Sequence, residues 1–74
     1  MEELIKILKE VAPQADVENE TDFIEHKVLD SLSIMRLVVM INDEFDVEIT
    51  PVDMTPENFK SLKTIYEMIQ RLED

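Results

Sequence analysis

Ser31 and the single histidine, His26, are the residues whose types first suggest chemistry. A hydroxyl and an imidazole five residues apart, with many carboxylates nearby, are the components of a nucleophilic serine site. Such a site also needs oxyanion donors and often a Gly-x-Ser-x-Gly turn, but this chain contains no glycine. We therefore interpret His26 as a loop histidine in solvent rather than as a catalytic base.

The acidic run over residues 42–48 is the second candidate, because its carboxylates could attract calcium or magnesium weakly. An EF-hand loop requires alternating ligands and a glycine at its sharp turn. The glycine is missing and the spacing differs, so we interpret the run as a solvated acidic face. The chain also has no cysteine, and therefore no thiolate metal ligand, disulfide or nucleophilic thiol.

The charge of the chain restricts its partners. The 74 residues include 18 acidic and 7 basic side chains, a formal net charge of -11. This charge argues against binding nucleic acid or anionic membranes and predicts partners with basic patches.

A single domain over residues 1–74 has room for only a limited core, which argues against an independent enzyme. No run approaches the ~18 apolar residues of a membrane span, so we expect a cytoplasmic monomer without membrane insertion.

Amphipathic segments must position these residues. The first helix should end near Pro13, the second should run from about Ser31 to Phe45, and the last should follow Ser61, its predicted cap. Thr55 and Pro56 predict a short helix through about residue 60, as N-cap and first helical residue. The predicted fold is all-α: a small bundle of three main helices plus one short helix, with a long loop between the first two.

Apolar spacing predicts which side of each helix is buried. The predicted core residues of the first and last helices are Leu4, Ile5, Leu8, Val11, Ala12, Leu62, Ile65, Tyr66, Ile69 and Leu72. In the loop over residues 14–29 the first half is polar, and Phe23, Ile24, Val28 and Leu29 should pin the second half to the core. Without glycine, any positive φ should fall on an asparagine or aspartate, such as Asn19 or Asp46.

The second helix is apolar on nearly every side, and either Asp30 or Ser31 could cap it. Its predicted core residues are Leu32, Ile34, Leu37, Val38, Ile41 and Phe45, while Met35, Val39 and Met40 have no clear place. Short helices cannot cover every side of it, so we expect an exposed apolar strip. One interpretation is a helical adaptor that binds a partner through this strip without being modified.

The combination of Asp30-Ser31-Leu32 at a helix start, a long loop before it and Glu44-Phe45-Asp46-Val47-Glu48-Ile49 after it resembles the acyl carrier protein family. The resemblance covers the four-segment plan of the chain and is most specific over residues 28–51. It implies that Ser31 carries 4'-phosphopantetheine through a phosphodiester, added by a phosphopantetheinyl transferase from coenzyme A with magnesium. The thiol of that arm would carry acyl or aminoacyl groups as thioesters.

The resemblance also implies partners and their contacts. Besides the transferase, they are an acyl or aminoacyl ligase and downstream acyltransferase or synthase enzymes. The positions that match partner contacts are Asp30, Leu32, Met35, Arg36, Val39 and Met40, and acidic Asp43, Glu44 and Glu48 would steer basic partners.

Some residues depart from the family pattern. His26-Lys27-Val28-Leu29 lacks the glycine that members often carry shortly before Asp-Ser-Leu, and Ser33 and Arg36 replace the acidic residues common in carriers for fatty-acid biosynthesis. The segments 28–31 and 55–59 look more like discrete D-alanyl or other aminoacyl carriers that are paired with a dedicated ligase.

Overall fold

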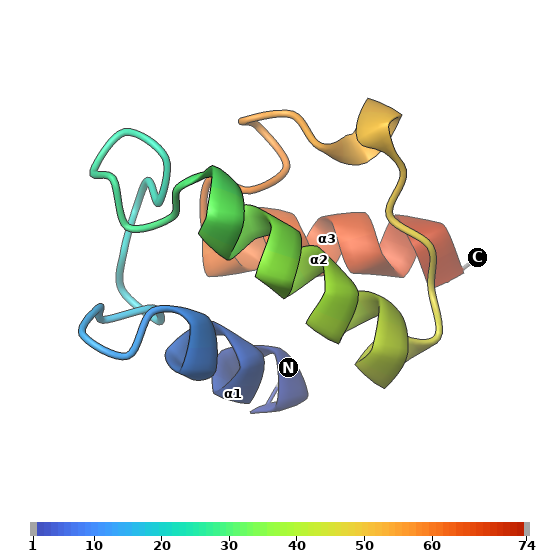
Figure 1. Ribbon diagram of the computed structural model, residues 1–74, viewed down its shortest axis with the longest axis horizontal. Helices are drawn as coiled ribbons and strands as arrows, with labels where there is room; N and C mark the ends of the chain where they lie inside the picture. Colours follow the sequence, from blue (N-terminus) through green and yellow to red (C-terminus); the bar gives the residue numbers. More distant parts are fainter. Residues whose placement is uncertain (1, 74) are drawn as a thin grey trace.

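Three α-helices form where the apolar spacing predicts them: α1 (Glu2–Val11), α2 (Ser31–Phe45) and α3 (Leu62–Glu73). The computed structural model describes residues 2–73. In it α1 packs against both α2 and α3 (Figure 1). No strand occurs within residues 2–73, and the predicted all-α fold is confirmed. None of the helices in that part of the chain is long and apolar enough to cross a membrane.

Two aspartates set the ends of α2. Asp30 is the N-cap, because its Oδ1 accepts a hydrogen bond from the N–H of Ser33 at 2.8 Å. Asp46 ends the helix in the left-handed region with φ of 53°, as predicted for a chain without glycine. Among residues 2–73 the other positive φ, 59°, belongs to Lys27. The prediction that a positive φ falls only on asparagine or aspartate was therefore wrong at Lys27, and the suggested Asn19 has no positive φ.

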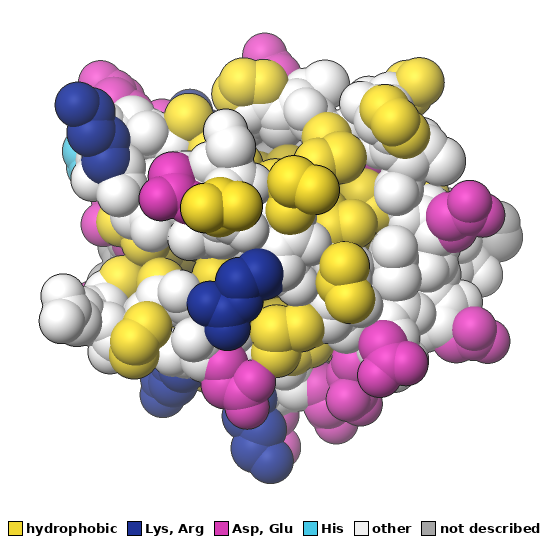
Figure 2. All heavy atoms as spheres, viewed as in Figure 1, with side chains coloured by type: hydrophobic (Ala, Val, Ile, Leu, Met, Phe, Trp, Pro, Cys, Tyr) yellow, Lys and Arg dark blue, Asp and Glu magenta, His cyan; other side chains and the backbone are white. Residues whose placement is uncertain are grey.

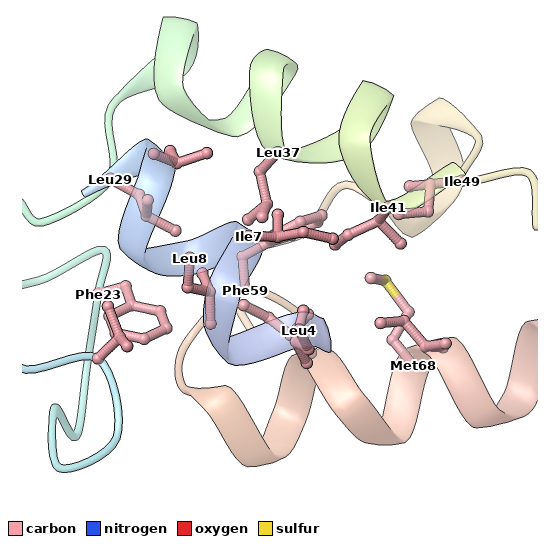
Figure 3. Close-up of a cluster of buried hydrophobic side chains, with 14 residues drawn as sticks. Leu4, Ile7, Leu8, Phe23, Leu29, Leu37, Ile41, Ile49, Phe59 and Met68 are labelled. Carbon is pink, nitrogen blue, oxygen red and sulfur yellow. The ribbon is translucent and has the colours of Figure 1, made fainter. Parts of the chain in front are cut away.

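The core lies between the three helices (Figure 3). Its labelled members include Leu4 and Leu8 of α1, Leu37 and Ile41 of α2, and Met68 of α3. Most predicted core residues are buried or pack against this cluster. Ile7 and Met68 are also buried, although they were not among the predicted core residues.

Leu32 was predicted to be core, but its side chain is 74% exposed. It precedes Leu37 by five residues, which turns it about 140° away from the buried side of the helix at 3.6 residues per turn. Phe45, also predicted as core, is half-buried at the end of α2.

The loop between α1 and α2 is anchored by Phe23, whose side chain is fully buried. Its N–H donates to the carbonyl of Lys60 at 2.6 Å, and its own carbonyl accepts from Val28 and Leu29 at 2.8 and 3.1 Å. Val28 packs against the core and Leu29 is buried within it. The prediction that the second half of this loop is pinned to the core is confirmed.

The short helix lies earlier in the chain than predicted. A 3-10 helix, η1 (Pro51–Asp53), forms there, with Asp53 Oδ2 accepting from the N–H and hydroxyl of Thr50. Thr55 and Pro56 instead begin a turn, in which Asn58 and Phe59 bond to carbonyls three residues back. This turn does not continue as a helix, because Phe59 enters the core and the carbonyl of Lys60 accepts from the loop.

Candidate functional site

Ser31 is the first residue of α2, and its side chain is exposed. The cap is supplied by Asp30, so the Ser31 hydroxyl is not needed to hold the helix end. No acidic residue lies in the first turn of α2. The carboxylate of the N-cap, Asp30, accepts from the Ser33 N–H and balances part of the partial positive charge at this helix end, which lies beside Ser31.

Asp30 is held as a carboxylate next to this hydroxyl. The hydrogen bond from the Ser33 N–H lowers the pKa of Asp30 below its ordinary value, and a bond from the Ser33 side chain acts in the same direction. The carboxylate is exposed. It is thus available to a partner at the entrance to α2.

A groove of about 370 Å³ begins beside Ser31. Ser31, Ile34 and Met35 form one wall, since residues three and four positions apart share a helix face. The remaining lining residues are Ile24, Met54, Thr55, Pro56 and Phe59. A long group attached to the hydroxyl of Ser31 would find apolar side chains along this groove.

His26 is engaged away from Ser31. Its Nδ1 pairs with Glu20 Oε1, which also accepts from the N–H groups of Thr21 and Asp22 at 3.1 and 3.2 Å. This hydrogen bond raises the pKa of His26 and lowers that of Glu20. His26 lines a hollow near the end of α1, whereas Ser31 lines a different groove.

Several predicted partner residues form an exposed apolar face. Leu32, Met35 and Val39 of α2 are 74%, 60% and 67% exposed. Val52 of η1 is 84% exposed, and Met54 beside it is 38% exposed. Figure 2 shows apolar side chains gathered over α2 and the segment that follows it. We refer to these five residues as the apolar face.

Sequence reasoning did not identify Val52 and Met54 as part of this surface. The available signal was Val52, an apolar residue between Pro51 and Asp53 in the connection after the second helix. Such exposed apolar groups often mark contact sites.

The other predicted partner residues lie around the apolar face or away from it. Arg36 is exposed on α2, and Asp43 and Glu48 are exposed at and beyond its C-terminal end. Figure 2 shows acidic side chains gathered around that end of the helix. Met40 is half-buried and lines a hollow between α1 and α2 with Ile7.

The acidic run over residues 42–48 contributes to the fold. Asn42 Oδ1 accepts from the N–H of Ile49 at 3.0 Å, and Asp46 ends α2. No three His, Asp or Glu side chains within residues 2–73 are grouped to hold a metal ion.

Comparison with known proteins identifies the family of the chain. A family model described as "Phosphopantetheine attachment site" matches residues 2–72, and this match supports covalent 4'-phosphopantetheine as the cofactor. Aminoacyl carrier protein 2 of Bradyrhizobium diazoefficiens is 33% identical over 63 residues, covering 85% of this chain and 70% of the relative.

Two relatives named acyl carrier protein are equally similar. That of Thermobifida fusca is 33% identical over 72 residues, covering 95% of this chain and 85% of the relative. That of Buchnera aphidicola is 34% identical over 71 residues, covering 89% of this chain and 88% of the relative. The chain therefore belongs to the acyl carrier protein family of phosphopantetheine-binding carriers.

Proposed function

We propose that the protein acts as a carrier rather than as an enzyme, and that Ser31 is the residue that receives the phosphopantetheine arm. The observation that supports this most directly is that Asp30, and not Ser31, caps the helix. Asp30 caps α2 through Ser33, while the Ser31 hydroxyl remains exposed. A transferase could therefore reach the hydroxyl without removing the cap.

The surroundings of Ser31 suit a phosphodiester and the arm beyond it. The first N–H groups of α2 and the positive end of the helix dipole would stabilise a phosphate there. The groove of about 370 Å³ would place apolar side chains along the arm. The attached group supplies a terminal thiol, which this cysteine-free chain lacks, and would hold the cargo as a thioester.

In this proposal the chain contributes no catalytic group of its own. His26 is paired with Glu20 and lines a hollow separate from the groove at Ser31. Bond formation would come from a phosphopantetheinyl transferase, an acyl or aminoacyl ligase, and downstream acyltransferase or synthase enzymes. The proposed carrier is a monomeric single domain that meets these partners in the cytoplasm through the apolar face and Arg36.

A discrete aminoacyl carrier with a dedicated ligase, such as a D-alanyl carrier, is the second candidate. Two relatives bear the name aminoacyl carrier protein, at 33% and 34% identity. Ser33 and Arg36 also replace the acidic residues that the fatty-acid carriers commonly have. Relatives named acyl carrier protein are also 33% and 34% identical to this chain, so sequence identity does not distinguish the two cargoes. The cargo has to be identified by experiment, from the enzyme that loads the arm.

The test begins with the unmodified protein, coenzyme A, magnesium and a broad-specificity transferase. Intact mass should show one phosphopantetheine increment on the wild type and on Ser33→Ala, but none on Ser31→Ala. Ser33 is a matched control because it lies two residues further along the same helix. The modified protein is then offered to acyl and aminoacyl ligases, and a further mass increment identifies the cargo.

Three results would contradict this proposal. No increment on the wild type would favour the unmodified adaptor, and an increment that persists in Ser31→Ala would overturn the site. Ester turnover by the unmodified protein that His26→Ala abolishes would indicate an enzyme instead.

A further inference from the structure

A single basic side chain interrupts the apolar face. Arg36 is exposed and is the only basic residue between Lys27 and Lys60. Leu32 lies four residues before it and Val39 three residues after it, so all three share one side of α2. Figure 2 shows basic side-chain atoms bordered by apolar ones over this helix.

The guanidinium of Arg36 has no partner within residues 2–73. Lys9 is paired with Glu18, and His26 with Glu20. The other arginine, Arg71, donates to Asn58 at 2.9 Å. Arg36 therefore keeps its hydrogen-bonding capacity for water or for another molecule.

The position of Arg36 on α2 separates it from the attachment point. Ser31 lies five residues earlier, about 140° around the helix and about 7.5 Å along its axis. The groove beside Ser31 is lined by Ile34 and Met35, and Arg36 is absent from its lining. Arg36 is thus not placed to neutralise a phosphate on Ser31.

An enzyme that covers Leu32 and Val39 must also remove Arg36 from water. Burying an unpaired guanidinium is strongly unfavourable, whereas a carboxylate can accept two parallel hydrogen bonds from it. Two turns further along the same side, about 10 Å away, Asp43 presents the opposite charge. One partner that covers this surface therefore needs a negative group opposite Arg36 and a positive group opposite Asp43.

We infer that the enzyme that loads the arm docks through an apolar surface carrying a carboxylate opposite Arg36 and a basic group opposite Asp43. This inference rests on the proposed carrier function. It adds an acidic group to the expectation drawn from the net charge of -11, which by itself predicts only basic patches on the partner.

The test measures the KM of ligases for the fully modified carrier. The probes are the acyl- and aminoacyl-activating ligases of the source genome, and each variant is converted completely with excess transferase and verified by mass. Arg36→Met keeps an apolar stem but removes the charge, and Arg36→Glu reverses it. Lys63→Glu is the control, because it makes the same charge reversal at an exposed position on α3.

If the ligase carries a carboxylate opposite Arg36, Arg36→Met should raise the KM at least about tenfold, because the carboxylate is then buried without the guanidinium that it paired with. Arg36→Glu should raise the KM further, and Lys63→Glu should leave it within about twofold of the wild type. Exchange of the facing carboxylate on the ligase for lysine should restore loading of Arg36→Glu.

A KM for Arg36→Met equal to or below that of the wild type would indicate a purely apolar partner surface and overturn the inference alone. A wild-type protein that accepts no phosphopantetheine, or that no ligase loads, would overturn the proposed function and this inference with it. Circular dichroism of each variant checks that the fold is retained.

Discussion

Replacing Phe23 with alanine should remove a large part of the stability of this domain. The ring is fully buried, and Phe-to-Ala changes at such positions destabilise by about 3–5 kcal/mol, combining lost burial with the cavity left behind. A domain of 74 residues is typically stable by about 4–11 kcal/mol. The variant should therefore lose a large fraction of the stability of the wild type.

The comparison with Phe45→Ala makes the prediction sharper. Phe45 is half-buried at the end of α2, so its loss should destabilise by only about 1–2 kcal/mol. The assay is urea unfolding followed by far-UV circular dichroism, with the dependence on urea concentration compared between variants. A loss below about 1 kcal/mol for Phe23→Ala, or one smaller than that for Phe45→Ala, would refute the assignment of Phe23 as the loop anchor.

The remaining predictions concern backbone strain, pH and steering. Lys27→Gly should stabilise the protein by about 0.5–1 kcal/mol relative to Lys27→Ala in urea unfolding, because glycine adopts a positive φ without a steric penalty. The pKa of His26 is raised from its ordinary value of 6.5, so its pairing stabilises the fold fully at pH values below 6.5. The pKa of Glu20 is lowered from 4.5, so its contribution is fully present at pH values above 4.5. The excess stability of wild type over His26→Gln should therefore be largest between these values and fall as the pH leaves this window in either direction. Changing Asp43 and Glu48 to lysine should slow association with the transferase and weaken its dependence on salt.

Each of these predictions has an outcome that contradicts it. Equal stability of Lys27→Gly and Lys27→Ala would show that the positive φ carries no penalty. A pH-independent difference between wild type and His26→Gln would show that the Glu20 pair does not stabilise the fold. An unchanged salt slope after reversing the charge of Asp43 and Glu48 would reject their role in steering.

The bounds of α2 were predictable because several local signals agree. Apolar residues at helical spacing, an aspartate before the first turn and an aspartate where the helix must end all specify the same segment. Which of Asp30 and Ser31 acts as the cap was not predictable, because both side chains suit the role. The structure resolves this, and the result leaves the hydroxyl of Ser31 exposed.

Lys27 shows what local signals miss. Lysine has no intrinsic preference for a positive φ, so its backbone conformation is set by the surrounding loop, in which Val28 and Leu29 both bond to Phe23. Asn19, the locally better candidate, instead bonds to Asp16 through its N–H and its side-chain amide.

The segment after α2 was the least predictable. Thr55 and Pro56 have the local chemistry of a helix start, but the carbonyl of Lys60 accepts from the distant Phe23, and Phe59 enters the core. These long-range contacts override the local preference and leave a single turn. Met54 of this segment lines the groove beside Ser31, which no local pattern indicates.

The most direct test of the carrier account is the modification state of the protein isolated from its own source organism. Fragmentation mass spectrometry of the peptide that contains Asp30-Ser31-Leu32 should place a phosphopantetheine group on the Ser31 hydroxyl. A protein that is unmodified in growing cells, or that carries the group on another residue such as Ser33, would contradict it.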